Sequence, residues 1–348
     1  MLRRPRRPTI RDVARFARVS HQTVSRVING DDYTSAETRA RVERVISRLG
    51  FRPSHAARSL ASRRTHTIGL VMGDVANPFF PDVVRGVEDV LSPAGYSLIL
   101  SSSRRDPERE LRNVKRLLER ETDGLVLGAP QVSPEELSRL GAQAAVPMVF
   151  LNRAVRGRHV ASVWIDWRTA TAEVVAYLGE LGHRRVGLVM PSREEDRAGQ
   201  REGWYTMALR EAGLEPAPTW ILRESISLEG GRTAGHRLLE LRDRPTAVIC
   251  HSDVMAIGVL EACRERRVTV PRDLSIVGWD DVPYASLVRP ALTTVRVPRY
   301  DLGRAAARRL LGLIGGAVDG PDAPLGLELI RRQTCRPPRA DRLSRTDR

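Results

Sequence analysis

The segment T-I-R-D-V-A-R-F-A-R-V-S-H-Q-T-V-S-R-V-I-N-G, residues 9–30, decides how the start of the chain folds. Thr9 and Asp12 form a capping-box-like start, with Asp in the place of Glu or Gln, which predicts a helix that begins after Thr9. Ser20 is a favourable N-cap for a second helix over residues 21–29. The few residues between the two helices leave room only for a tight turn. Two short helices joined in this way predict a helix-turn-helix.

A third helix completes this predicted domain. Val24, Val27 and Ile28 lie at i, i+3 and i+4 in the second helix, so they share one face that can pack on the first helix. Ser35 predicts the N-cap of the third helix, and Gly50 predicts its end. We therefore expect a small all-α domain at the start of the chain.

The positive charge of the protein is concentrated in this region. The chain carries a formal net charge of +15, and residues 1–66 alone contain 16 arginines against five acidic residues. Such an excess favours a polyanionic partner. The second helix has a polar face, and Gln and Arg suit adenine and guanine edges in the major groove. We expect double-stranded DNA as the partner, although a three-helix domain without a DNA role is the alternative. The predicted DNA contacts are Thr9, Ser20, His21, Gln22, Thr23, Ser25, Arg26 and Asn29.

Residues 9–64 closely resemble the lac repressor (LacI/GalR) family of bacterial transcription regulators, and the resemblance continues to about residue 335. The core V-S-x-x-T-V-S-R-V-I-N is highly specific for this family. Arg18 is a departure, because the family usually has Gly or Asn in this turn. If Arg18 adopts a left-handed conformation, it costs on the order of 1 kcal/mol.

Pro53 and Ser54 stop the preceding chain and predict the cap of another short helix. About eight residues are too few for a stable isolated helix in water, so a plain basic linker is the alternative. The resemblance implies a hinge helix over residues 51–65 that pairs with a second copy on the operator. It implies that Leu60 wedges into the minor groove and that Ala57 lets the paired helices approach. The contacts implied in this segment are Ser54, His55, Ala57, Arg58 and Leu60.

Apolar strands alternate with helices after residue 66. Two successive sets of such units predict parallel sheets covered on both faces, and therefore two lobes. We expect residues 163–165 to begin the second set and residues 293–297 to begin the return to the first lobe. The pattern resembles the periplasmic-binding-protein fold, in which a small molecule binds between two lobes.

The expected fold is therefore an all-α helix-turn-helix head followed by an α/β two-lobe core with parallel sheets. The expected domains are the head at 1–50, the hinge helix at 51–65, the N-terminal lobe at 66–163 and 293–325, the C-terminal lobe at 164–292 and 326–337, and a basic, disordered tail at 338–348.

Ligands of such folds bind at the carboxyl ends of the strands. Phe79 and Phe80 follow the first strand, although two Phe at a helix start can equally be core residues. For Asp280 the alternative is a capping residue. Gln200 stands where many family members have Arg, and Arg197 or Arg201 could compensate for the lost charge. The resemblance implies a sugar or sugar derivative as effector, with nucleosides or other polar metabolites as alternatives. The expected effector residues are Phe79, Phe80, Asn152, Arg197, Gln200, Ile226, Ser252 and Asp280.

The sequence contains no catalytic, cofactor or metal-binding motif. No H-E-x-x-H, G-x-S-x-G or Cys/His cluster occurs, and no G-x-G-x-x-G follows the first strand. Three cysteines make no disulfide framework and fit a reducing cytoplasm. No apolar run approaches the roughly 20 residues that a bilayer crossing needs. We expect no enzyme activity, no cofactor, no metal and no membrane contact.

These observations predict a ligand-responsive, sequence-specific transcription regulator, a repressor that binds a palindromic operator as a homodimer. The effector acts only through its different affinity for two arrangements of the lobes, and the sequence leaves open whether it is an inducer or a co-repressor. The C-terminus has no leucine heptad, which favours a dimer over a tetramer. One alternative is a periplasmic-type solute-binding protein, against which the missing signal peptide and the basic head argue. Another is a sugar-modifying enzyme on the same fold.

Replacing Leu60 by Ala is expected to weaken binding to the operator far more than binding to random DNA. The wedge acts where the duplex is kinked at the specific site, whereas the phosphate contacts that hold any duplex stay unchanged. Gel-shift titrations of the wild-type protein and L60A with both duplexes measure the two losses. Equal losses on operator and random DNA would contradict this role.

Overall fold

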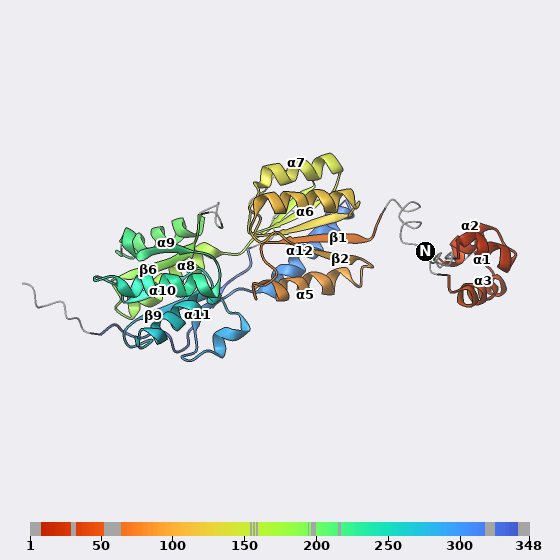
Figure 1. The fold of residues 1–348 in the computed structure, drawn as a ribbon. Coiled ribbons are helices and arrows are strands. Elements are labelled where there is room, and N and C mark those ends of the chain that lie inside the picture. Colours follow the sequence, from red (N-terminus) through yellow and green to blue (C-terminus); the bar gives the residue numbers. More distant parts are fainter. Residues whose placement is uncertain are drawn as a thin grey trace, which may run out of the picture. The chain divides into compact units, whose positions relative to one another are not determined.

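The structure is a computed structural model, and it describes residues 8–28, 33–51, 64–153, 155, 157, 159–193, 195, 200–214, 217–316 and 324–339. The chain divides into two compact units, residues 1–66 and 67–348, which are named the head and the body and are described separately. The head is all-helical and the body is α/β (Figure 1). The predicted fold class is therefore confirmed. Most of the predicted hinge helix, residues 52–63, and most of the predicted tail, residues 340–348, lie outside the described residues.

The head consists of three described helices, α1 (Ile10–Ala17), α2 (His21–Ile28) and α3 (Ala36–Leu49). At the start of α1, Thr9 Oγ1 accepts the N–H of Asp12 at 3.4 Å, and the Asp12 carboxylate accepts the N–H of Thr9 at 2.9 Å. At the start of α2, Ser20 Oγ accepts the N–H of Thr23 at 3.1 Å. Both predicted caps are therefore confirmed.

The turn between α1 and α2 contains the departure from the family pattern. Arg18 has φ 52° and ψ 48°, which is the left-handed conformation. A residue with a side chain in this conformation lowers the stability of the head by on the order of 1 kcal/mol.

The core of the head joins its three helices through buried Val13, Val24 and Val42. Phe51 joins this core from beyond α3, a contact that the helical spacing did not predict.

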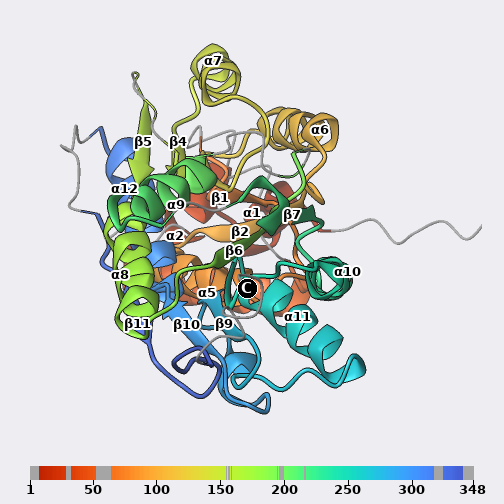
Figure 2. The same ribbon diagram turned by 90° about the vertical axis from the view of Figure 1, so that its left-hand side faces the viewer.

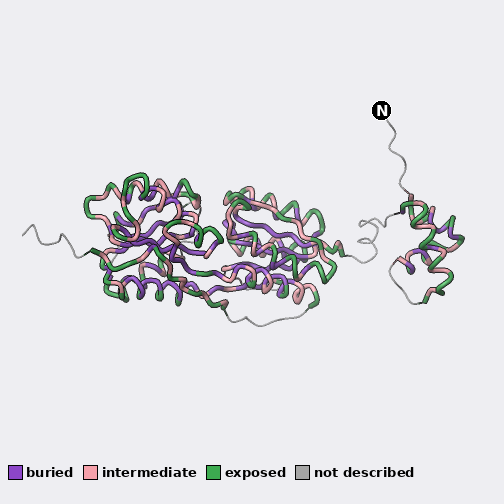
Figure 3. Tube along the Cα trace, turned by 90° about the horizontal axis from the view of Figure 1, so that it is seen from below, coloured by how far each residue is buried: buried purple, intermediate pink, exposed green. Residues whose placement is uncertain are grey.

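The first lobe of the body is built on a five-stranded sheet with the order β2-β1-β3-β4-β5, in which every pair is parallel. Its strands are β1 (Thr67–Met72), β2 (Ser97–Ser102), β3 (Gly124–Gly128), β4 (Met148–Leu151) and β5 (Val160–Val163). Helices α6 (Pro107–Glu119) and α7 (Pro134–Ala144) cover one face, and α5 (Phe80–Leu91) and α12 (Arg299–Ile314) cover the other (Figure 1). Strands β1, β3 and β4 are buried almost throughout, whereas the edge strands β2 and β5 are only partly buried, and the helix exteriors are exposed (Figure 3).

The second lobe is built on a six-stranded sheet with the order β11-β10-β9-β8-β6-β7, in which only the pair of β10 and β11 is antiparallel. Its strands are β6 (Val186–Pro191), β7 (Ile221–Glu224), β8 (Ala247–Cys250), β9 (Ser275–Asp280), β10 (Thr293–Arg296) and β11 (Glu328–Ile330). Helices α8 (Trp167–Glu180) and α9 (Gln200–Glu211) lie on one side of the sheet, and α10 (Leu228–Glu240) and α11 (Asp253–Glu265) lie on the other (Figure 2).

The strand pairing corrects one predicted lobe boundary, at residue 293, and one predicted strand, at residues 163–165. Residues 293–296 were expected to begin the return to the first lobe, but β10 pairs with β9 in the second sheet. The return to the first lobe therefore begins after β10, with α12. Residues 160–163 pair with β4 and close the first sheet, so the strand expected at 163–165 does not open the second lobe. The apolar pattern predicts strands, but it does not specify the sheet that each strand joins.

Helices α5 and α12 cross at backbone contact. A Cβ atom at Gly303 would overlap the carbonyl oxygen of Val83, and one at Gly86 would overlap the carbonyl oxygen of Tyr300. Since only glycine lacks a Cβ atom, these two positions allow the close crossing. Helix α12 follows directly on β10 of the second lobe. Its crossing with α5 therefore anchors the returning chain on the first lobe.

Replacing Gly303 by Ala is expected to lower the free energy of unfolding of the body by about 1–3 kcal/mol, because the added methyl group forces α5 and α12 apart. Urea unfolding of the full-length chain measures the loss. Gly179→Ala in α8 is the control, since a Cβ atom there meets nothing within 4 Å and Ala favours a helix. An unchanged midpoint for Gly303→Ala would contradict the tight crossing.

Candidate functional site

Helix α2 exposes the polar face that was predicted to contact DNA. His21, Gln22 and Arg26 are exposed, and Thr23 and Ser25 are half-buried. The hydroxyls of Thr9 and Ser20 serve as helix caps, so they position α1 and α2 whatever else they contact. Of the other predicted contacts, Asn29, Ser54, His55, Ala57, Arg58 and Leu60 lie outside the described residues.

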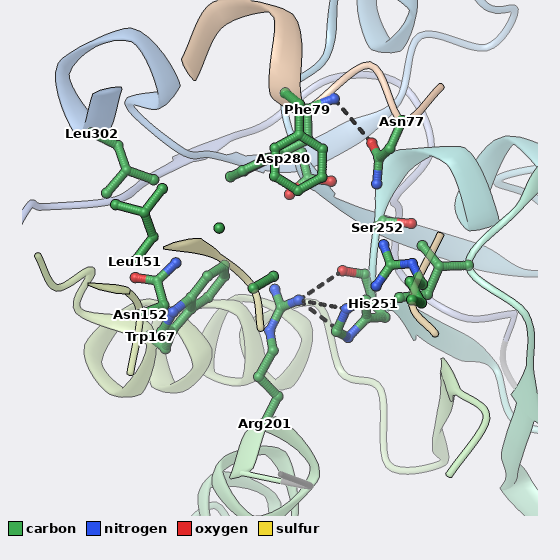
Figure 4. A pocket seen from close by; sticks show the side chains of 15 residues that line it. Asn77, Phe79, Leu151, Asn152, Trp167, Arg201, His251, Ser252, Asp280 and Leu302 are labelled. Atoms are coloured by element: carbon green, nitrogen blue, oxygen red, sulfur yellow. Dashed lines mark hydrogen bonds between the residues drawn. The ribbon is translucent and has the colours of Figure 1, made fainter. Parts of the chain in front are cut away.

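A cavity of about 110 Å³ lies between the two lobes of the body (Figure 4). A second cavity of about 130 Å³ adjoins it and shares Asn152, Trp167 and Arg201 with it. The two together are named the cleft. Asn152, Ser252 and Asp280 of its lining lie at the carboxyl ends of β4, β8 and β9, where ligands of parallel sheets are expected.

The structure brings together six of the eight predicted effector residues: Phe79, Phe80, Asn152, Ile226, Ser252 and Asp280 line the cleft. Gln200 begins α9, but its side chain is not described, and Arg197 lies outside the described residues. Phe80 belongs to the buried core as well as to the cleft, and Ser252 Oγ also accepts the N–H of Met255 at 3.4 Å at the start of α11. These two residues therefore combine a structural role with a place at the site.

Arg201 supplies a positive charge to the cleft, one residue after Gln200. Its guanidinium carbon lies 3.8 Å from the ring centroid of Trp167 and 5.0 Å from that of Trp279. Stacking on aromatic faces favours a desolvated guanidinium. Its Nη1 also donates to the carbonyl oxygen of His251 at 3.1 Å. The two indoles and this carbonyl hold the cation at the wall of the cleft. Figure 4 shows Arg201 with Trp167 and His251.

The imidazole of His251 is kept neutral by its surroundings. Burial lowers its pKa well below the usual value, and the nearby charge of Arg201 lowers it further. Arg201 Nη1 lies 3.0 Å from His251 Nε2 and 3.1 Å from Nδ1. Since a guanidinium only donates, the ring nitrogen that accepts from it carries no proton. His251 therefore adds a neutral polar surface beside Arg201.

Asp280 ends β9 inside the cleft. Burial raises the pKa of its carboxyl to about 7, while the guanidinium groups of Arg201, Arg299 and Arg105 oppose that rise. Asp253 lies close by, and burial and the charge of Asp280 raise its pKa as well. The Asp280 carboxyl thus changes charge near neutral pH.

Asp253 is held by partners within the second lobe. Its Oδ1 accepts the hydroxyl of Thr294 at 2.5 Å, and its Oδ2 accepts the N–H of Val282 at 2.8 Å. Asp253 therefore shapes the loop after β9, whereas Asp280 faces the cavity (Figure 4).

Asn152 presents an unsatisfied polar atom to the cleft. Its Oδ1 is buried and has no hydrogen-bond partner among the described residues. A buried acceptor without a partner costs about 1–3 kcal/mol. A hydrogen-bond donor from a bound molecule would remove that cost.

The predictions missed Trp167, His251 and Arg105, which also line the cleft. His251 directly follows β8, so the rule that places ligands at carboxyl ends of strands could have found it. Trp167 begins α8 and Arg105 lies in a loop, and no local sequence signal marks either of them.

Two negative findings apply to the described part of the chain. No group of three or more His, Cys, Asp or Glu side chains is placed to hold a metal ion. None of the described helices is both long and apolar enough to span a bilayer.

Comparisons with known proteins match both units. The model of bacterial regulatory proteins of the lacI family matches residues 9–54, and the model of a periplasmic binding protein-like domain matches residues 175–335. Catabolite control protein A of Priestia megaterium is 36% identical over 304 residues, which cover 87% of this chain and 91% of that protein. The HTH-type transcriptional repressor CytR of Escherichia coli K12 is 34% identical over 329 residues, which cover 94% and 96%.

Solved structures agree with this assignment. The lac repressor dimer bound to operator and the anti-inducer ONPF matches with a TM-score of 0.86 and 27% identity, over 95% of this chain and 100% of that one. A complex of the transcriptional regulator CelR with cellobiose matches with a TM-score of 0.70 and 32% identity, over 94% and 100%. The chain therefore belongs to the LacI family of ligand-responsive bacterial transcription regulators.

Proposed function

We propose that this regulator is a repressor that binds a nearly palindromic operator as a homodimer and responds to a sugar or sugar derivative in the cleft. The observation that carries the proposal is the cleft between the lobes, in a chain whose head exposes a polar recognition helix. The lacI family match over residues 9–54 favours this function over a solute-binding protein. No catalytic step is proposed for the cleft.

The head supports sequence-specific DNA binding. His21, Gln22 and Arg26 are exposed on α2, and the arginines of residues 1–66 supply the charge for phosphate contacts. Gln22 can pair with adenine and Arg26 with guanine in the major groove. Two heads related by twofold symmetry imply an operator with the same symmetry.

The cleft supports a small ligand rich in hydroxyl groups. Phe79 and Trp167 offer apolar faces to a sugar ring, while Asn152 and Asp280 offer hydrogen-bond acceptors to its hydroxyls. Sugars are bound in several related structures: CelR with cellobiose, an Enterococcus faecium regulator with ribose and a Lactobacillus casei regulator with sucrose. The positive charge of Arg201 would also attract the anionic group of an acidic sugar derivative.

A contact between the lobes lies next to the cleft. Arg299 at the start of α12 donates to the carboxylate of Asp82 in α5 at 2.8 Å and to the carbonyl oxygen of Asp280. A ligand that contacts the Asp280 side chain therefore lies next to the Arg299 contact that links the two lobes. We infer that the ligand changes the angle between the lobes, and through it the distance between the two heads of a dimer.

The proposal predicts two linked results for the full-length protein. Selection from a random pool of duplexes should enrich a nearly palindromic sequence, because two identical heads read it. A thermal-shift screen of sugars and nucleosides should then identify a stabilising ligand that changes operator affinity at least tenfold, measured by gel shift. Light scattering should show a dimer.

Two outcomes would count against this function. Failure to enrich any symmetric duplex, with or without the ligand, would contradict the regulator. Sugar binding that is retained while no DNA is selected would support the solute-binding protein instead.

Asp280 makes the affinity for such a ligand depend on pH. If the ionised carboxylate accepts hydroxyl hydrogen bonds, protonation of Asp280 removes an acceptor. With a pKa of about 7, affinity should rise as the pH rises and should be about tenfold lower at pH 6 than at pH 8. Calorimetric titrations with the ligand from the screen at these pH values measure the change.

Two variants control for other titrating groups. Asp280→Asn should bind the ligand with a flat pH profile, whereas Asp243→Asn, at an exposed site outside the cleft, should keep the wild-type profile. A wild-type affinity that does not vary with pH would contradict the role of Asp280.

A further inference from the structure

A larger hollow lies at the opposite end of the second-lobe sheet. Its volume is about 630 Å³, and its lining includes Arg185, Thr246 and Leu274. These residues directly precede β6, β8 and β9. The cleft lies at the carboxyl ends of the same strands, so the two sites are separated by the length of the sheet.

Arginine side chains dominate the lining of this hollow. The five that line it are Arg185, Arg242, Arg244, Arg272 and Arg339. Two carboxylates oppose them: Asp243 pairs with Arg185 at 2.9 Å, and Asp273 pairs with Arg272 at 3.0 Å and with Arg339 at 3.5 Å. The guanidinium groups therefore exceed the carboxylates by three.

Two of these arginines have no anionic partner in the described structure. Neither Arg242 nor Arg244 forms an ion pair with any described residue, although both border the hollow. They lie in the short loop between α10 and β8, and both border the same hollow as the other three arginines. Like charges gathered in this way repel one another, and a bound anion would relieve the repulsion.

The inner wall of the hollow is rigid and neutral. His183 is buried, and its ring nitrogens lie 2.9 Å from Thr246 Oγ1 and 3.1 Å from Ser275 Oγ. Burial lowers the pKa of His183, so the ring adds no charge. These contacts connect His183, which lies just before β6, to the starts of β8 and β9 at the inner wall of the hollow.

The arginine-lined hollow of the second lobe, we propose, binds a small anion that carries two or more phosphate groups. Guanidinium groups match phosphate oxygens with paired, charge-assisted hydrogen bonds. One phosphate would neutralise only part of the excess charge, whereas linked phosphates can reach several arginines at once. The proposal does not depend on the role of the cleft, because no residue lines both sites.

The experiment uses the full-length protein and tripolyphosphate as the probe. The head also attracts polyanions, so the readout must be local: hydrogen exchange of peptides that cover residues 242–247 and 269–275. Tripolyphosphate should slow exchange in these peptides, and inorganic phosphate should do so only at concentrations at least tenfold higher. Titration of the protection gives the affinity of the hollow alone.

Matched variants separate this site from general charge effects. Arg242→Gln with Arg244→Gln should weaken the tripolyphosphate-dependent protection at least tenfold. Arg116→Gln with Arg120→Gln removes the same charge from the exposed end of α6 in the first lobe and should leave it unchanged. Arg339→Gln is an independent variant outside the α10–β8 loop and should weaken it as well. Absence of protection in the wild-type protein, or equal affinity in both double variants, would overturn the proposal.

Discussion

The buried guanidinium of Arg299 links the two lobes of the body. Arg299 is 8% exposed, and it reaches the carboxylate of Asp82 in the first lobe and the carbonyl oxygen of Asp280 in the second. A buried charge is tolerated only when its partners stay in place. The end of β9, the start of α12 and the start of α5 are therefore held at one point. The cleft is adjacent to this point, so its shape depends on the same contact.

Local signals predicted the head accurately, because capping and helical spacing act within a few residues. Thr9 and Ser20 cap their helices as expected. Arg18 adopts the left-handed conformation that the sequence left as a conditional expectation at a turn where the family usually has Gly or Asn. The assignment of strands to the two lobes of the body was harder to predict. The sequence predicted that a strand forms near residue 293, but its pairing with β9 depends on contacts between distant segments. The apolar pattern of a strand is the same in either sheet, so it does not indicate which sheet the strand joins.

The candidate site was predicted in part through the resemblance to relatives and in part through strand ends. Phe79, Asn152 and Asp280 meet at the cleft as expected. The cation beside them belongs to Arg201, which the sequence indicates only as a possible replacement for the charge lost at Gln200. Its stacking on Trp167 arises from tertiary packing of α8 against α9, which sequence spacing does not reveal. The pKa of Asp280 likewise depends on burial, a property of the assembled lobes.

The interlocked glycines of α5 and α12 determine which part of the body α12 moves with. Where two backbones touch, neither helix can slide along the other without a clash, so the two helices form one unit of the first lobe. Any relative movement of the lobes must therefore take place outside this helix pair, in the segments that connect the lobes. The helix that carries Arg299 is thereby kept with the first lobe while the second lobe changes its angle.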